Sequence, residues 1–136
     1  MVATPEKRTL QKPLRLLLVE DSENDAMLLL RELGRAGYEV DHERVYTAEE
    51  MREALRSEWD VIVSDYRMPR FSAMEALEMA TASGSDAPFI VVSGRIGEDV
   101  AVEAMRGGAY DYVMKGTLSR LPQTVERGME DRKSVV

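Results

Sequence analysis

The 136-residue sequence contains no cysteine and a single histidine, His42. The absence of cysteine excludes disulfide bonds, thiol nucleophiles and cysteine-based zinc sites. One histidine cannot build a histidine-rich metal site, and His42 lies in a polar segment where we expect it at the surface rather than in a Ser-His-Asp triad. A metal site in this chain would therefore use oxygen ligands.

Long apolar runs are also missing, because no stretch approaches the roughly 18 residues that a membrane-spanning helix needs. The N-terminal segment carries charges but lacks the apolar core of a secretory signal; it reads MVATPEKRTLQKP. We therefore expect a soluble, cytoplasmic protein with no membrane partner.

Basic residues are the minority among the charged ones. The 18 Lys and Arg face 25 Asp and Glu, so the formal net charge is −7. Affinity for nucleic acid rests largely on cationic side chains that displace counterions from the phosphate backbone, so we expect no direct binding of nucleic acid. The length and the 44% of hydrophobic residues fit one globular domain.

Short apolar runs recur at wide intervals and predict strands that are covered on both faces, as in a parallel sheet. The expected strands are Leu14–Val19, Val61–Val63 and Phe89–Val92, with two weaker ones at Glu39–Val45 and Tyr110–Met114. We expect a polar tail over residues 1–13, one domain over residues 14–133 and a C-terminal tail over residues 134–136.

Apolar stripes at helical spacing separate or follow these runs. They consist of Ala26, Leu29, Leu30 and Leu33; Ala48, Met51 and Leu55; Ala73, Ala76, Leu77 and Ala80; Ala101, Ala104 and Met105; and Leu121, Val125 and Met129. Two helix starts are marked by capping boxes, Thr47 with Glu50 and Ser72 with Glu75. The alternation of strands and helices predicts an α/β fold, a doubly wound parallel sheet with helices on both faces.

Polar residues close the predicted strands at the edge where open α/β sheets bind ligands. Glu20 and Asp21 follow the first strand, Asp65 ends the third, Ser93 the fourth and Lys115 the fifth. Each residue alone has an ordinary explanation, such as an acid at a helix start, a turn residue or a solvated strand end. Together they place three carboxylates, a hydroxyl and an ammonium group at one edge.

Three neighbouring carboxylates resist ionisation unless a cation joins them. Oxygen ligands alone select a hard ion, so we expect Mg²⁺, with Mn²⁺ as a substitute. A phosphoryl group held beside a carboxylate suggests covalent catalysis, in which Asp65 attacks phosphorus to give an aspartyl phosphate. Lys115 and the cation would neutralise charge on the transferring group, and the Ser93 hydroxyl would donate to one of its oxygens.

Four ordered motifs carry a resemblance to a known family. They are LLLVED, ending at Glu20 and Asp21; VIVSDYRMP, around Asp65; FIVVSG, around Ser93; and GAYDYVMK, ending at Lys115. Over about residues 14–132 the chain resembles the response regulator receiver domains of two-component phosphorelay signalling. The resemblance implies a flavodoxin-like fold, a five-stranded parallel sheet in the order 2-1-3-4-5 with five helices.

The resemblance also implies how the site works. Asp65 would take a phosphoryl group from a phosphohistidine on a sensor histidine kinase or a histidine phosphotransfer protein. The implied metal ligands are Asp21, Asp65 and the main-chain carbonyl of Arg67, with Glu20 acting through water. We expect no turnover enzyme, only a chain that at most catalyses phosphorylation of its own aspartate and slow dephosphorylation.

A switch is implied as well. Ser93 and Tyr112 match the family's switch positions, and their movement would alter the surface of the fourth helix, fifth strand and fifth helix, about residues 98–132. This surface would signal to an unknown output protein or fused domain. The chain would be either a stand-alone responder or a piece of a longer protein, and the stretch SGRIGEDVAVEAM is similar to receivers joined to sensor-kinase assemblies.

The sequence departs from the family pattern in places. Glu20 stands where aspartate is common, and Gly116 follows Lys115 where a proline with a cis peptide bond is usual. Arg67 and Arg95 lie two residues beyond Asp65 and Ser93, where a long cation can overhang a phosphoryl group. Our hypothesis is that these two arginines set the lifetime of the phosphorylated state.

Two other function classes compete with this interpretation. One is a receiver-like interaction module that signals by binding alone, without phosphorylation. The other is an enzyme on a similar fold, either a flavin carrier or an aspartate-based phosphatase. The acidic stretch EDSEND is unlike the phosphate loop of a flavin carrier, and Arg67 stands where such a phosphatase needs a second acid.

Overall fold

The computed structural model describes residues 11–94 and 98–134 of the chain. Strands and helices alternate throughout, as the hydrophobic patterning predicts. In chain order the elements are β1 (Lys12–Val19), α2 (Glu23–Arg35), β2 (Tyr38–Val45), α3 (Ala48–Ala54), β3 (Val61–Asp65), α4 (Ala73–Ala82), β4 (Phe89–Ser93), α5 (Glu98–Arg106), β5 (Asp111–Met114), a 3₁₀ turn (Lys115–Arg120) and α6 (Leu121–Ser134).

The five strands form one sheet in the order β2-β1-β3-β4-β5, and every neighbouring pair is parallel. This confirms the predicted doubly wound α/β fold and its strand order. The register sets Asp65 opposite Val92 and Ser93 opposite Met114, so that β3, β4 and β5 end at the same edge.

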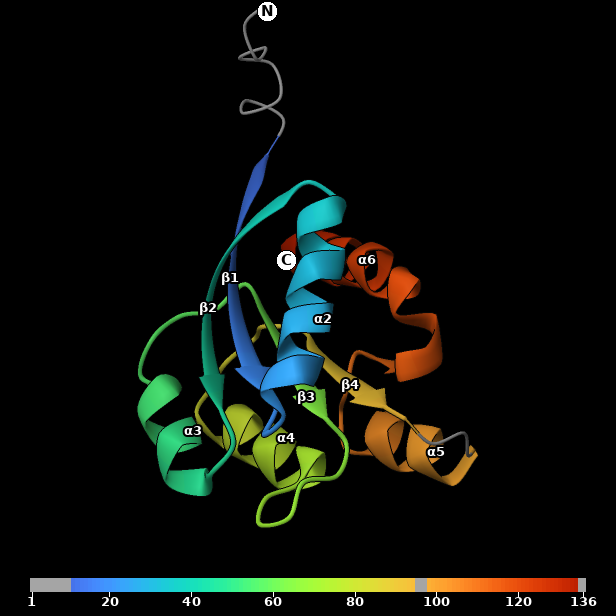
Figure 1. Ribbon diagram of the computed structural model, residues 1–136. Helices are drawn as coiled ribbons and strands as arrows, with labels where there is room; N and C mark the ends of the chain where they lie inside the picture. Colours follow the sequence, from blue (N-terminus) through green and yellow to red (C-terminus); the bar gives the residue numbers. More distant parts are fainter. Residues whose placement is uncertain (1–10, 95–97, 135–136) are drawn as a thin grey trace, which may run out of the picture.

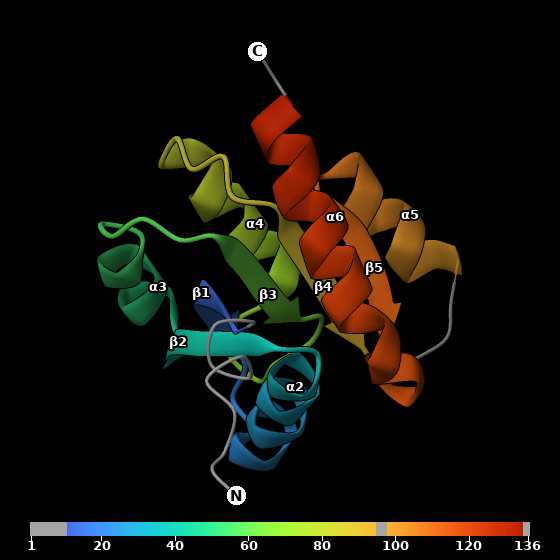
Figure 2. The same ribbon diagram turned by 90° about the horizontal axis from the view of Figure 1, so that it is seen from above.

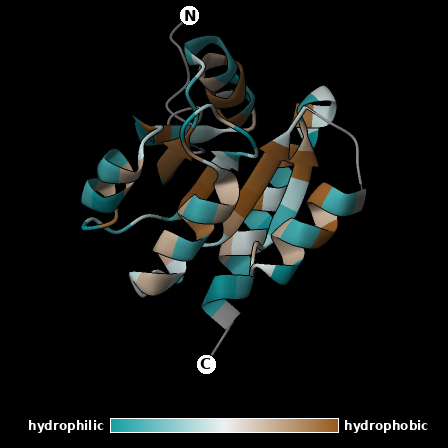
Figure 3. Cartoon of the chain, turned by 90° about the horizontal axis from the view of Figure 1, so that it is seen from below, coloured by the Kyte–Doolittle hydropathy of each residue, from teal (hydrophilic) through white to brown (hydrophobic). Residues whose placement is uncertain are grey.

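Helices cover both faces of the sheet, and each face has its own hydrophobic core (Figures 1 and 2). On one face α2 and α6 bury residues such as Leu33 and Val125 against the sheet. On the other face α3, α4 and α5 bury residues such as Met51 and Leu77. Figure 3 shows the hydrophobic residues concentrated in the central strands, with hydrophilic residues on the outer sides of the helices. The continuous apolar runs are therefore explained by burial on both faces.

The edge strand β2 is different, because most of its side chains are partly or fully exposed. His42 lies on this strand and is exposed, as predicted. β1 begins at Lys12, two residues before the apolar run that predicted it, because Lys12 and Pro13 pair with Tyr38 and Glu39 of β2. Backbone pairing, and not side-chain hydrophobicity, extends the strand.

Both predicted capping boxes start helices. The Thr47 hydroxyl accepts from the Glu50 N–H (3.1 Å), and the Ser72 hydroxyl accepts from the Glu75 N–H (3.2 Å). One core prediction was wrong, since Met105 is 49% exposed. Its neighbour Ala104 is fully buried, and one residue further along a helix the side chain has turned by about 100° away from the sheet.

Two further observations concern the backbone after β5 and the hydropathy of the helices. The Lys115–Gly116 peptide bond is trans, and the chain continues from it into the 3₁₀ turn. Within residues 11–94 and 98–134, none of the helices combines the length and the hydropathy that a bilayer-crossing segment requires.

Candidate functional site: an acidic cluster at the carboxyl edge of the sheet

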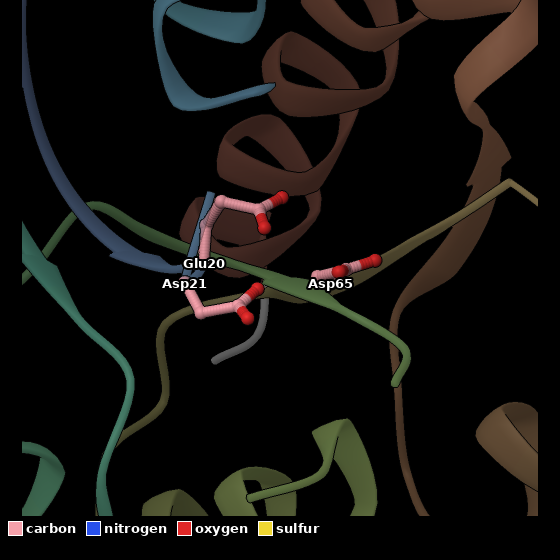
Figure 4. A group of neighbouring side chains, drawn as sticks. All are labelled: Glu20, Asp21 and Asp65. Carbon is pink, nitrogen blue, oxygen red and sulfur yellow. The ribbon is translucent and has the colours of Figure 1, made fainter. Parts of the chain in front are cut away.

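Three carboxylates meet where β1 and β3 end. Glu20 and Asp21 follow β1 directly and Asp65 is the last residue of β3, so the adjacency of these two strands brings the three side chains together. One carboxylate oxygen from each lies within 4.8 Å of the other two. Figure 4 shows the carboxylates of Glu20 and Asp21 on the side that faces Asp65. The sequence prediction of a shared acidic site is thus matched by the geometry.

The cluster is shielded from water to different degrees. Glu20 is 3% exposed and the Asp65 side chain 11% exposed, whereas Asp21 is exposed. The Ser22 N–H donates to Glu20 Oε2 (3.1 Å), which fixes one buried carboxylate oxygen against the start of α2. The site therefore has a buried inner wall and an open outer side.

Lys115 supplies the positive charge that faces these acids. It is the first residue after β5. Its Nζ atom lies 3.4 Å from Asp65 Oδ1 and 3.7 Å from Glu20 Oε1. A third acid, Asp25 of α2, is closer, with 2.7 Å between Nζ and Oδ2.

Burial and neighbouring charges both shift the pKa values of the site residues. Burial raises the pKa of Glu20 to about 7, and the neighbouring charge of Asp65 adds to this rise. Burial also raises the pKa of Asp65, although the ammonium group of Lys115 partly opposes the effect. Burial alone would lower the pKa of Lys115, but the hydrogen bond to Asp25 and the other carboxylates outweigh it and raise that pKa. Ionising Glu20 and Asp65 is therefore disfavoured mainly by their burial.

These features fit a hard divalent cation. The donors are all oxygens, they converge on one place, and ionising them together is unfavourable without added positive charge. Glu20, Asp21 and Asp65 are the side chains that could hold the ion. The predicted role of the Arg67 carbonyl stays a prediction; Arg67 is exposed and forms a short backbone bridge with Ser72.

The two predicted switch residues, Ser93 and Tyr112, belong to the face of the sheet that α3, α4 and α5 cover. Ser93 is buried at the end of β4, and its side chain shares a face with Val91 because strand side chains alternate. Tyr112, opposite Val91 in β5, is half-buried and packs against the core beneath α3, α4 and α5. Arg95 lies outside the described residues.

Three contacts at the site were missed by the sequence analysis. Arg44 of β2 donates to the carbonyls of Glu20 (3.0 Å) and Asp21 (3.4 Å) and so holds the backbone of the acid pair. The Tyr66 hydroxyl, next to Asp65, donates to Glu103 of α5 (2.9 Å). The contacts of Arg44 and Tyr66 join residues that are far apart in the sequence, so no local sequence pattern could predict them. The third, between Asp25 and Lys115, involves an acid of the EDSEND stretch.

Comparisons with known proteins agree with the geometry. The family model described as "Response regulator receiver domain" matches residues 16–126. The C4-dicarboxylate transport transcriptional regulatory protein DctD of Pseudomonas aeruginosa is 35% identical over 124 residues; the match covers 90% of this chain but only 26% of that protein. The chain thus spans about a quarter of that relative's length.

Two further similarities concern proteins made largely of the matching domain. The chemotaxis protein CheY of Thermotoga maritima is 28% identical over 101 residues, which cover 74% of this chain and 84% of that protein. The signal receiver domain of a putative Luxo repressor protein from Vibrio parahaemolyticus superposes with a TM-score of 0.77 at 26% identity, covering 89% of this chain and 93% of that one.

The raised pKa of Glu20 predicts how stability depends on pH. The folded chain retains a proton on Glu20 that the unfolded chain releases from about pH 4.5 upward, so in EDTA-containing buffer the free energy of unfolding should fall as the pH rises towards 7. Glu20→Gln cannot ionise and should lack this contribution. The difference between wild type and variant in urea denaturation should therefore change by about 1 to 3 kcal/mol over this window. A difference that stays constant with pH would contradict the assignment.

The convergence of the three carboxylates predicts Mg²⁺ binding. Isothermal titration should detect Mg²⁺ binding to the wild type, and Asp21→Ala should weaken it by about tenfold or more because a ligand is lost. Asp41→Ala, which removes an exposed acid from β2, is the matched control and should bind as the wild type does. No binding to the wild type, or equal affinity in Asp21→Ala, would refute the metal site.

Proposed function

Because the chain belongs to the response regulator receiver domain family, we propose that it is a phosphorylatable switch in which Asp65 accepts a phosphoryl group. The observation that carries the proposal is the surroundings of Asp65. Its carboxylate lies beside two further acids and an ammonium group, at the edge of a sheet whose strand order suits ligand binding there.

The proposed reaction moves one phosphoryl group. A carboxylate oxygen of Asp65 bonds to phosphorus while the phosphorus–nitrogen bond of a phosphohistidine breaks, and the imidazole leaves with the bonding electrons and takes up a proton. The Lys115 ammonium group neutralises charge on the phosphoryl oxygens, and the Ser93 hydroxyl donates to one of them. Mg²⁺ or Mn²⁺ held by Glu20, Asp21 and Asp65 would supply further positive charge.

The donor partner would be a sensor histidine kinase or a histidine phosphotransfer protein, and the exchange would take place in the cytoplasm. The chain would not be a turnover enzyme, since it would catalyse at most its own phosphorylation and slow dephosphorylation. DctD, a transcriptional regulatory protein, matches over only a quarter of its length. We therefore assign the output to a separate protein or a fused domain.

The signal would leave through the surface of α5, β5 and α6. Ser93 and Tyr112 face the core beneath α5. Tyr66, the residue after Asp65, donates a hydrogen bond from its hydroxyl to Glu103 of the same helix. A phosphoryl group with a charge close to −2 needs to bias this surface by only about 1 to 3 kcal/mol to act as a signal. Arg67 is exposed, and its influence on the lifetime of the phosphorylated state stays a prediction.

Phosphorylation distinguishes this function from a module that signals by binding alone. Incubation with acetyl phosphate and Mg²⁺ should add the mass of one phosphoryl group to the wild type, as measured by intact-mass spectrometry. Asp65→Asn should not be labelled, because an amide is a poor nucleophile. Asp86→Asn, an exposed acid at the opposite edge of the sheet, should be labelled normally.

The result also tests the enzyme alternatives. An unlabelled wild type would favour the binding module, and rapid turnover of a generic phosphate ester would favour a phosphatase. Either outcome would overturn the proposed function.

A further inference from the structure

The nearest partner of Lys115 is not the proposed phosphoryl acceptor. Its ammonium group lies 2.7 Å from Asp25, a distance typical of a strong charge-assisted hydrogen bond. The distance to Asp65 is longer, at 3.4 Å. Asp25 therefore competes with Asp65, which is also within ion-pair distance, for the ammonium group of Lys115.

The start of α2 explains why the Asp25 carboxylate is available for this contact. Asp25 is the third residue of the helix, and its N–H donates to the Ser22 hydroxyl (3.2 Å). At such a position an acid usually turns back to the N–H of the capping residue. Here the Ser22 N–H already donates to Glu20, so the Asp25 carboxylate is left to bind Lys115.

The start of α3 shows a different arrangement in the same chain. There the carboxylate of Glu50 turns back to its own helix start and accepts from the N–H of Tyr46 (2.9 Å), the residue before the capping Thr47. The contact between Asp25 and Lys115 is thus not required for capping a helix. It joins α2 to the end of β5 across 90 positions of sequence.

Space for movement lies beside this contact. A small cavity of about 60 Å³ adjoins the ion pair. Besides Glu20 it is lined by Asp25, Leu28, Leu29, Val92, Lys115 and Leu118. The side chains of Lys115 and Asp25 are 29% and 39% exposed, so neither is locked by dense packing. The ammonium group can change partners without a change of fold.

We propose that Asp25 is a positioning residue that holds Lys115 back from Asp65 until phosphorylation. The inference rests on the proposed function and adds a residue to it. When Asp65 carries a phosphoryl group with a charge close to −2, the ammonium group leaves the single charge of Asp25 for a phosphoryl oxygen. Asp25 therefore sets both the rate of phosphorylation and the lifetime of the phosphorylated chain.

The test compares Asp25→Asn with the wild type. The amide keeps the size of the side chain but removes the competing charge, so phosphorylation by acetyl phosphate with Mg²⁺ should become faster and loss of the phosphoryl group slower. Each change should be about two- to fivefold, as expected from the coupling in a partly exposed ion pair. Time courses of intact mass, during labelling and after removal of the donor, measure both. Asp25→Glu restores a carboxylate and should return both rates towards wild type.

A second background separates the ion pair from general charge repulsion. In Lys115→Met the ammonium group is gone. In this background Asp25→Asn should change the rates of phosphorylation and of phosphoryl loss much less than it changes them in the wild type. Equal effects in both backgrounds, unchanged or slower phosphorylation of Asp25→Asn, or an Asp25→Glu variant that behaves like Asp25→Asn would overturn the inference. A wild type that is never labelled would instead refute the proposed function itself.

Discussion

The burial of carboxylates at the ends of β1 and β3 is the constraint on which the site depends. Two of the three acids are largely buried, and burial makes their ionised forms costly. Lys115 offsets only part of this cost, since its ammonium group is shared with Asp25. A site built in this way gains most from a ligand that brings positive charge.

The sheet holds this unfavourable arrangement in place. β1 and β3 are central strands whose apolar side chains are buried on both faces, so their ends have little freedom to separate. Arg44 fixes the carbonyls of the acid pair, and the Ser22 N–H fixes the Glu20 side chain. The stability of the fold thus comes from the core, while the unfavourable burial of ionisable carboxylates is confined to one edge of the sheet.

The two faces of the sheet would have different roles in the proposed function. Lys115 and Asp25 lie on the side of α2, where the charge of Asp65 is balanced. Tyr66, Ser93 and Tyr112 lead to the side of α5, which would transmit the signal. Asp65 stands at the edge between these faces. A change in the charge of Asp65 would therefore be compensated on the side of α2 and transmitted on the side of α5.

Much of this could be predicted from sequence, because the decisive signals are local. Apolar runs located the strands, and the residues that close them located the acids, the hydroxyl and the lysine. Met105 was misplaced because helical spacing alone does not fix how wide a buried stripe is. The contacts of Arg44 and Asp25 were out of reach for another reason, since each joins segments that only the strand register and helix packing bring together.

The most direct test of the account is to locate the phosphoryl group. Borohydride reduces an aspartyl phosphate to an alcohol, so chain phosphorylated with acetyl phosphate can be reduced, digested and sequenced by mass spectrometry. The account predicts reduction at Asp65 alone, and only when Mg²⁺ was present during labelling. Reduction at Glu20, Asp21 or another acid, or labelling of Asp65 that is equally fast in EDTA, would contradict it.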